Sequence, residues 1–205
     1  PVLDPRVPLV ELPSLDIYND HYPMRLPGVW EIKSVGDAVE VAAFMGGSFP
    51  EPLAFSVRAF QHLRRRINDF DLVQDNQSLG YGLLGMQRMG LPVLATIHHP
   101  ITVDRRLEME HAETPWKRLS KARWYGFTKM QTRVASQMPR VLTVSQSSLS
   151  DISADHNVPL ERLNVVPVGV DQELFRPLPD VRRVIQALTN RQQTLDHCPL
   201  WPVET

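Results

Sequence analysis

Short runs of apolar residues alternate along this chain with longer segments in which apolar residues recur every three or four positions. The apolar runs predict four strands, over residues 71–75, 92–97, 140–144 and 163–168. The longer segments predict helices over residues 35–45, 50–67, 80–89, 103–137 and 147–156. Short, nearly all-apolar strands that alternate with helices predict an α/β fold, a parallel sheet with helices on both faces.

The two ends of the chain depart from this alternation. Six prolines fall within the first 27 residues, so we expect extended or looped chain there, apart from one short strand near Val7–Leu12. Residues 181–205 have room for one helix, to about Gln193, and then show no pattern, so we expect them to be loosely packed. Because the first residue is Pro1, we also expect the natural amino terminus to be missing.

Composition narrows the class of protein. The 22 basic and 23 acidic residues leave a net charge of −1, which predicts no nucleic-acid partner. The single cysteine, Cys198, cannot form an internal disulfide and suits a reducing compartment. No apolar run is long enough to span a bilayer and no signal peptide is visible, so we expect a cytoplasmic protein.

The carboxyl ends of the predicted strands carry polar residues. They are Asp75–Ser78, His98–His99, Ser145–Ser148 and Gly169–Asp171. Ligands of an open parallel sheet bind outside the carboxyl ends of its strands, so these residues predict the rim of a pocket. Purely structural explanations stay open, with Asp75–Asn76 as a turn, Ser147 as a helix N-cap and Gly169 as a turn glycine.

The histidine pair has three possible explanations, which are catalysis, a metal and plain structure. Asp104, Glu108 and His111 are near in sequence, but their spacing matches no metal motif, so we expect no metal. Neighbouring residues of a strand face opposite sides of a sheet, so the two histidines cannot both point into the core. We expect His98 to face the rim.

One stretch, residues 115–140, is strongly basic and aromatic. It has no acidic residue and seven basic ones, which are Lys117, Arg118, Lys121, Arg123, Lys129, Arg133 and Arg140. Four aromatic residues are interleaved with them. Such a segment can lie on an anionic membrane surface or bind phosphates, or it can be a helix with a solvated basic face and buried aromatics.

Three segments together resemble a known family. ATIHHPITVDRR at 95–106, RVLTVSQSS at 140–148 and VVPVGVDQELFRP at 165–177 are similar to the amino-terminal domain of family 4 retaining glycosyltransferases. That family has the GT-B architecture, in which two Rossmann-like domains face each other across a cleft. The resemblance implies an incomplete GT-B amino-terminal, acceptor-side domain over residues 1–179, with residues 180–205 as an atypical tail.

The resemblance implies transfer of a sugar from a nucleotide-sugar donor to an acceptor hydroxyl, with retention of configuration and without a cofactor. His98 matches the family position that faces the sugar and is the expected catalytic residue. Asn76, His99, Arg105 and Arg106 are expected to contact the acceptor, the arginines through a phosphate or carboxylate. The basic stretch would suit a lipid-linked acceptor. Two alternatives stay open, a non-catalytic sugar- or phosphate-binding domain and a metal-dependent hydrolase.

The sequence also departs from the family pattern. It lacks the family's opening strand with its glycine-rich loop and the pair of glutamates, eight positions apart, that belongs to the donor-binding domain. We therefore expect a piece truncated at both ends that does not catalyse transfer alone and is marginally stable.

Overall fold

The computed structural model describes residues 4, 6–18 and 25–172. The chain forms two compact units, Pro1–Pro167 and Val168–Thr205. In the second unit the described residues, 168–172, form no helix or strand. The predicted tail over 180–205, its helix to about Gln193 and the domain boundary at 179 lie outside the described residues.

The first unit contains a four-stranded parallel sheet. Its strands are β1 (Val73–Asn76), β2 (Val93–Thr96), β3 (Val141–Thr143) and β4 (Leu163–Val165). They lie in the order β1-β2-β3-β4, and each neighbouring pair is parallel. In the register, Asn76 is the partner of Thr96, so β1 and β2 end side by side. The predicted strands and the Rossmann-like α/β class are thereby confirmed.

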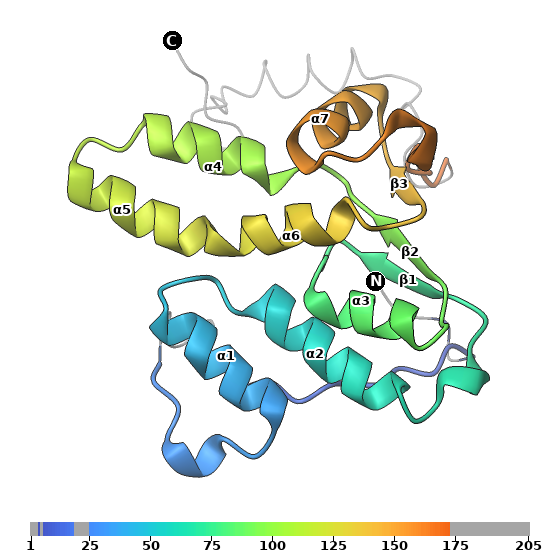
Figure 1. The fold of residues 1–205 in the computed structure, drawn as a ribbon, viewed down its shortest axis with the longest axis horizontal. Coiled ribbons are helices and arrows are strands. Elements are labelled where there is room, and N and C mark those ends of the chain that lie inside the picture. Colours follow the sequence, from blue (N-terminus) through green and yellow to red (C-terminus); the bar gives the residue numbers. More distant parts are fainter. Residues whose placement is uncertain (1–3, 5, 19–24, 173–205) are drawn as a thin grey trace, which may run out of the picture. The chain divides into compact units, whose positions relative to one another are not determined.

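Seven helices alternate with these strands in the described part of the chain (Figure 1). They are α1 (Val35–Met45), α2 (Glu51–Leu63), α3 (Tyr81–Arg88), α4 (Ile101–Glu110), α5 (Pro115–Trp124), α6 (Thr128–Ala135) and α7 (Gln146–His156). Ser34 begins α1 with a capping box to Asp37. The N-cap of α7 is Ser145 rather than the expected Ser147, because Ser145 is the last extended residue and accepts a bond from the Ser148 N–H.

The expected strand near Val7–Leu12 is wrong. The structure assigns no strand to residues 6–18, and the side chains of Val7, Leu9 and Val10 are exposed. Pro8 and Pro13 have no N–H to donate to a neighbouring strand, which disfavours pairing at this place. The segment is instead anchored by Leu15 and Ile17, which are buried.

The single helical stretch expected over 103–137 is divided. α4 ends at Glu110, and α5 turns back to lie beside α4, while α5 and α6 are joined by a 3₁₀ turn at Tyr125–Phe127 (Figure 1). Thr114 accepts a hydrogen bond from the Lys117 N–H and Pro115 stands at the first helical position. Proline favours the first turn of a helix and disrupts its interior, so a new helix starts there.

The two faces of the sheet differ in burial. Val93, Ala95 and Val141 point into a core completed by side chains of α3, α6 and α7, such as Leu83 and Val134. On the alternate positions, Gln74, Asn76 and Asn164 are exposed and Leu94, Thr96 and Leu142 are half-buried. Within the described residues, one set of alternating strand positions therefore lies in the core and the other is more exposed.

Candidate functional site

His98 and Asn76 form a pair at the carboxyl edge of the sheet. His98 Nε2 lies 2.8 Å from Asn76 Oδ1, and both residues are exposed. An amide oxygen can only accept, so Nε2 carries the proton in this pair, and in the neutral ring Nδ1 is then the acceptor. Among the described residues, Nδ1 makes no hydrogen bond. His98 is thus exposed at the carboxyl edge of the sheet, with Asn76 beside it.

His99 lies apart from this pair. Its Nε2 is 3.2 Å from Oδ2 of Asp104, in the first turn of α4, and its side chain is also exposed. The sequence argument used the alternation of strand residues, but β2 ends at Thr96, so that alternation does not govern either histidine. Both rings lie outside the core.

A loop after β1 supports His98 through Gln77, a strand-end residue to which the sequence assigned no specific function. The side-chain amide of Gln77 accepts a hydrogen bond from the His98 N–H (2.8 Å) and donates one to the His99 carbonyl (2.9 Å). Gln77 carries no local signal for this function, because its partners are more than twenty positions away. Only the pairing of β1 with β2 brings them together.

Asp75, expected at the rim or alternatively in a turn, is buried beneath the same loop. Its carboxylate accepts hydrogen bonds from the Leu79 N–H (3.0 Å) and the Ser78 hydroxyl. Burial raises the pKa of Asp75, and these hydrogen bonds lower it by less. Asp75 therefore organises the loop and does not face the rim.

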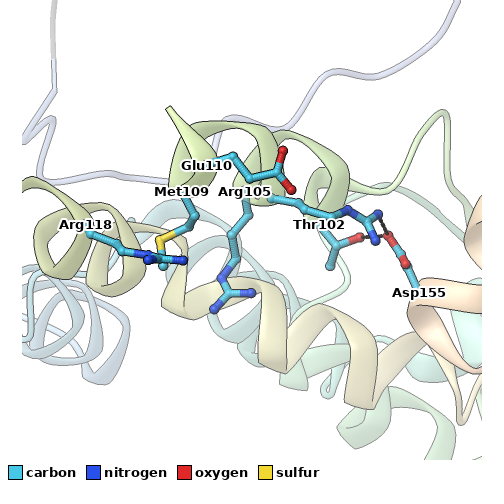
Figure 2. Close-up of a pocket in the computed structure, with 7 residues that line it drawn as sticks. Thr102, Arg105, Met109, Glu110, Arg118 and Asp155 are labelled. Atoms are coloured by element: carbon cyan, nitrogen blue, oxygen red, sulfur yellow. Dashed lines mark hydrogen bonds and ion pairs between the residues drawn. The ribbon is translucent and has the colours of Figure 1, made fainter. Parts of the chain in front are cut away.

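Arg105 and Arg106 lie on α4 and line an open hollow (Figure 2). The other lining residues are Thr102, Met109, Glu110, Arg118 and Asp155. Arg106 forms an ion pair with Asp155 at 3.0 Å, and the Thr102 hydroxyl donates to the same carboxylate oxygen at 2.6 Å. The half-buried Arg105 has no side-chain hydrogen bond or ion pair to the described residues.

A second hollow adjoins the first and shares Thr102 and Arg105 with it. Its remaining lining residues are Thr128, Lys129, Thr132 and Arg133, none of which is acidic. Neither hollow is lined by Asn76, His98 or His99. The five predicted site residues therefore form separate groups: the His98–Asn76 pair, His99 against Asp104, and the two arginines at the hollow.

The basic stretch, residues 115–140, has features of both explanations given above, with part of its aromatic side chains packed inside and part exposed. Trp124, Tyr125 and Phe127 join an aromatic cluster with Tyr18 and Phe49, in which Phe127 is buried, Tyr125 is half-buried and Trp124 is 38% exposed. On α5, however, Trp116 is 76% exposed and Leu119 50% exposed. Two of the seven cations, Lys117 and Lys121, form ion pairs with Glu113 and Glu108 outside the stretch.

The described residues contain no group of three or more His, Cys, Asp or Glu side chains placed to hold a metal ion. None of the helices in this part of the chain is long and apolar enough to cross a bilayer.

Comparison with known proteins gives two matches. Residues 17–174 match glycosyltransferase family 4. The chain is also 51% identical over 175 residues to the MMP alpha-(1->4)-mannosyltransferase of Mycolicibacterium hassiacum. That alignment covers 85% of this chain and 42% of the relative, so the chain spans less than half the length of this curated protein.

Proposed function

The chain belongs to glycosyltransferase family 4, and we propose that it forms the acceptor-side domain of an enzyme that transfers a sugar from a nucleotide-sugar donor to an acceptor hydroxyl. The similar mannosyltransferase supports mannose as the sugar and an α-(1→4) linkage as the product. The same proposal includes retention of the anomeric configuration. The nucleotide sugar is a substrate, and no bound cofactor is assigned.

The observation that carries this proposal is the His98–Asn76 pair at the carboxyl edge of β1 and β2. With the Nε2 proton engaged by Asn76, the Nδ1 lone pair of His98 can accept a hydrogen bond from a sugar hydroxyl. A polar group already oriented before the substrate binds needs no reorganisation during the reaction, which is the basis of electrostatic catalysis. We therefore assign His98 the catalytic contact and Asn76 the orientation of its ring.

The arginine hollow supports an acceptor-binding function for α4. Arg106 is partly neutralised by Asp155, whereas Arg105 is not paired among the described residues and has donors free for a phosphate or carboxylate of the acceptor. His99 follows His98 in the chain, and its ring lies against Asp104 in the first turn of α4, the helix that carries both arginines. We propose that His99, Arg105 and Arg106 contact the acceptor.

The exposed face of α5 supports a second, peripheral function, which is docking on an anionic membrane surface next to a lipid-linked acceptor. Trp116 and Leu119 offer apolar area, and Arg118, which lines the hollow on α4, has no side-chain partner among the described residues. The ion pairs of Lys117 and Lys121 reduce the charge available for this contact. Cytoplasmic location with reversible membrane association is the corresponding proposal.

The test is a transfer assay with a nucleotide-activated mannose and an α-(1→4)-linked oligomannoside, using the longer protein that contains this chain. His98→Ala should lower turnover about a hundredfold, because a positioned polar group is removed. His111→Ala, which changes an exposed histidine at the end of α4, is the matched control and should keep its turnover. Turnover of His98→Ala near the wild-type value would contradict the assignment.

A parallel assay of this chain alone separates the competing functions. We expect acceptor binding without turnover, because the glutamate pair associated with the donor-binding domain is absent from the sequence. Acceptor binding by the longer protein, again without transfer, would support the non-catalytic binding domain. Transfer or hydrolysis abolished by a chelator would support the metal-dependent alternative.

A further inference from the structure

We propose that Gln77 is a positioning residue whose side-chain amide fixes the backbone at His98 and His99 and thereby aims the His98 ring at Asn76. The function of this clamp rests on the proposed function of His98. Whether Gln77 fixes this backbone can be tested independently of sugar transfer.

The first support is that the Gln77 amide makes both of its hydrogen bonds to the same two residues. Its oxygen accepts from the His98 N–H at 2.8 Å and its nitrogen donates to the His99 carbonyl at 2.9 Å. The register of β1 with β2 ends at Asn76 and Thr96. The side chain of Gln77 therefore continues the connection between the two strands beyond their last backbone pair.

The second support is that the backbone around Gln77 adopts an unfavourable conformation. Gln77 has φ 64° and Leu79 has φ 47°, and these are two of the four described non-glycine residues with positive φ. The left-handed region is costly for residues with a Cβ atom, and such conformations persist only where the surroundings enforce them. Here the unfavourable conformation lies next to the proposed catalytic histidine.

The surroundings do enforce this conformation. On the buried side of the loop, Asp75 accepts hydrogen bonds from the Leu79 N–H and the Ser78 hydroxyl. Gln131, a buried residue of α6 that is 2% exposed, donates to the carbonyls of Gln77 and Ser78, at 3.3 Å each. Two buried side chains from different elements thus hold the loop that presents Gln77.

The consequence concerns the orientation of the His98 ring. On the other side of β2, the Ile97 N–H donates to the Leu142 carbonyl of β3 at 2.8 Å, so the chain is held up to Ile97 without Gln77. Beyond Ile97, within the described part of the chain, the hydrogen bonds that join the backbone of His98 and His99 to β1 and its loop are those of Gln77. Without the clamp, the ring would sample orientations in which Nε2 no longer faces Asn76.

Amide hydrogen exchange of the uniformly labelled chain, followed by NMR, tests the clamp directly. Gln77→Ala should speed exchange of the His98 amide about tenfold, because it loses one hydrogen bond. The Ile97 amide is the internal reference and should keep its rate, since its acceptor lies in β3. Gln74→Ala is the matched control, because Gln74 also bonds from β1 to β2 but to the Thr96 side chain.

A conservative variant and a second readout separate positioning from general stability. Gln77→Glu keeps an acceptor for the His98 N–H and should retain most of its protection, whereas the donor to His99 is lost. The ¹⁵N shifts of the His98 ring should indicate the Nε2-protonated form in wild type and a mixture of both forms in Gln77→Ala. Unchanged His98 exchange in Gln77→Ala would overturn the proposal, as would equal acceleration at Ile97.

The outcome can be told apart from failure of the proposed function, because neither readout requires transfer. If His98→Ala kept its turnover, the catalytic assignment would fail while the exchange data still decided the clamp. If both assignments hold, Gln77→Ala should lower kcat about tenfold and change KM little, since the acceptor contacts on α4 remain.

Discussion

Ion pairs of nearly equal length occur in two regions of this protein, in opposite surroundings. Between α1 and α2, Arg58 bonds Asp37 at 2.6 Å and Glu40 at 2.5 Å, and all three side chains are buried. On the α4–α5 hairpin, Lys117 bonds Glu113 at 2.5 Å, with the two side chains 58% and 75% exposed. The N–O distances are nearly the same in the two regions, so the difference in burial must decide how much each ion pair contributes to stability.

The buried cluster stabilises the fold, whereas an exposed cation can leave its ion pair to bind a ligand. Burial by itself would raise the pKa of Asp37, but hydrogen bonds from Arg58, Ser34 and the Lys33 N–H lower it. Asp37 therefore stays charged and paired. In an exposed ion pair, water readily replaces either partner, and each such pair contributes about 0–1 kcal/mol to stability. An anionic partner can therefore bind the cations of α4 and α5.

The largest effect should come from breaking the buried cluster. Arg58→Ala leaves two carboxylates buried without their cation and should lower the free energy of unfolding by about 3–5 kcal/mol. Denaturant unfolding measures the change. Arg64→Ala, at the exposed end of α2, is the control and should cost less than about 0.5 kcal/mol. Equal costs for the two variants would remove the distinction between buried and exposed charges.

A buried carboxylate without a cation should have an intermediate effect. Asp75→Ala removes the acceptor of the buried Leu79 N–H and should cost about 2 kcal/mol, whereas Asp75→Asn keeps one acceptor and should cost less. Because burial raises the folded-state pKa of Asp75 above the unfolded value of 3.8, wild type gains stability relative to Asp75→Asn as pH falls through that raised pKa. Unfolding measured from pH 7 downward would show the opposite trend if the carboxylate were stabilised by its surroundings.

A buried histidine should give a smaller, pH-dependent effect. His156 is buried, its Nδ1 lies 3.0 Å from the Thr132 hydroxyl, and burial lowers its pKa. Its stabilising contribution is therefore present above the unfolded pKa of about 6.5 and is lost as pH falls below it, by at most about 1.4 kcal/mol per pH unit. His156→Gln should have a flatter profile between pH 7.5 and 5.5. Parallel profiles for the two proteins would contradict this.

The smallest effect on stability should come from the exposed pair. Lys117→Ala should change the free energy of unfolding by less than about 0.5 kcal/mol. Flotation with vesicles that contain anionic lipid should nevertheless recover less of this variant, and less of Trp116→Ala, than of wild type at low salt. Equal recovery of all three proteins at low and high salt would leave the α5 cations as a solvated surface.

Most of the fold could be predicted from local patterns. Short apolar runs and three- to four-residue periodicity report directly on burial within a strand or helix, which is why all four strands and most helices of the described unit were expected where they occur. The errors have local physical causes too. Two prolines disfavoured a strand near Val7–Leu12, and Thr114 with Pro115 began a new helix inside the expected stretch.

The site was predicted less completely. The strand ends were found because polar residues after an apolar run mark the carboxyl edge, and His98 and Asn76 do meet there. The grouping of the candidates was not predictable. Arg105 and Arg106 lie in the second turn of α4 and line a hollow with Asp155 of α7, away from His98 and Asn76. Gln77 was included only as one of the strand-end residues 75–78, without a function of its own, and Gln131 was missed.

The sequence by itself determined the alternation of strands and helices, the polar edge and membership of the family, because these depend on residues close together in the chain. The tertiary structure alone decided that Gln77 bonds the backbone of His98 and that Asp75 is buried rather than exposed. Each of these depends on strand order and register, which join residues more than twenty positions apart. No local periodicity carries that information, because pairing across a sheet is settled only when the whole core packs.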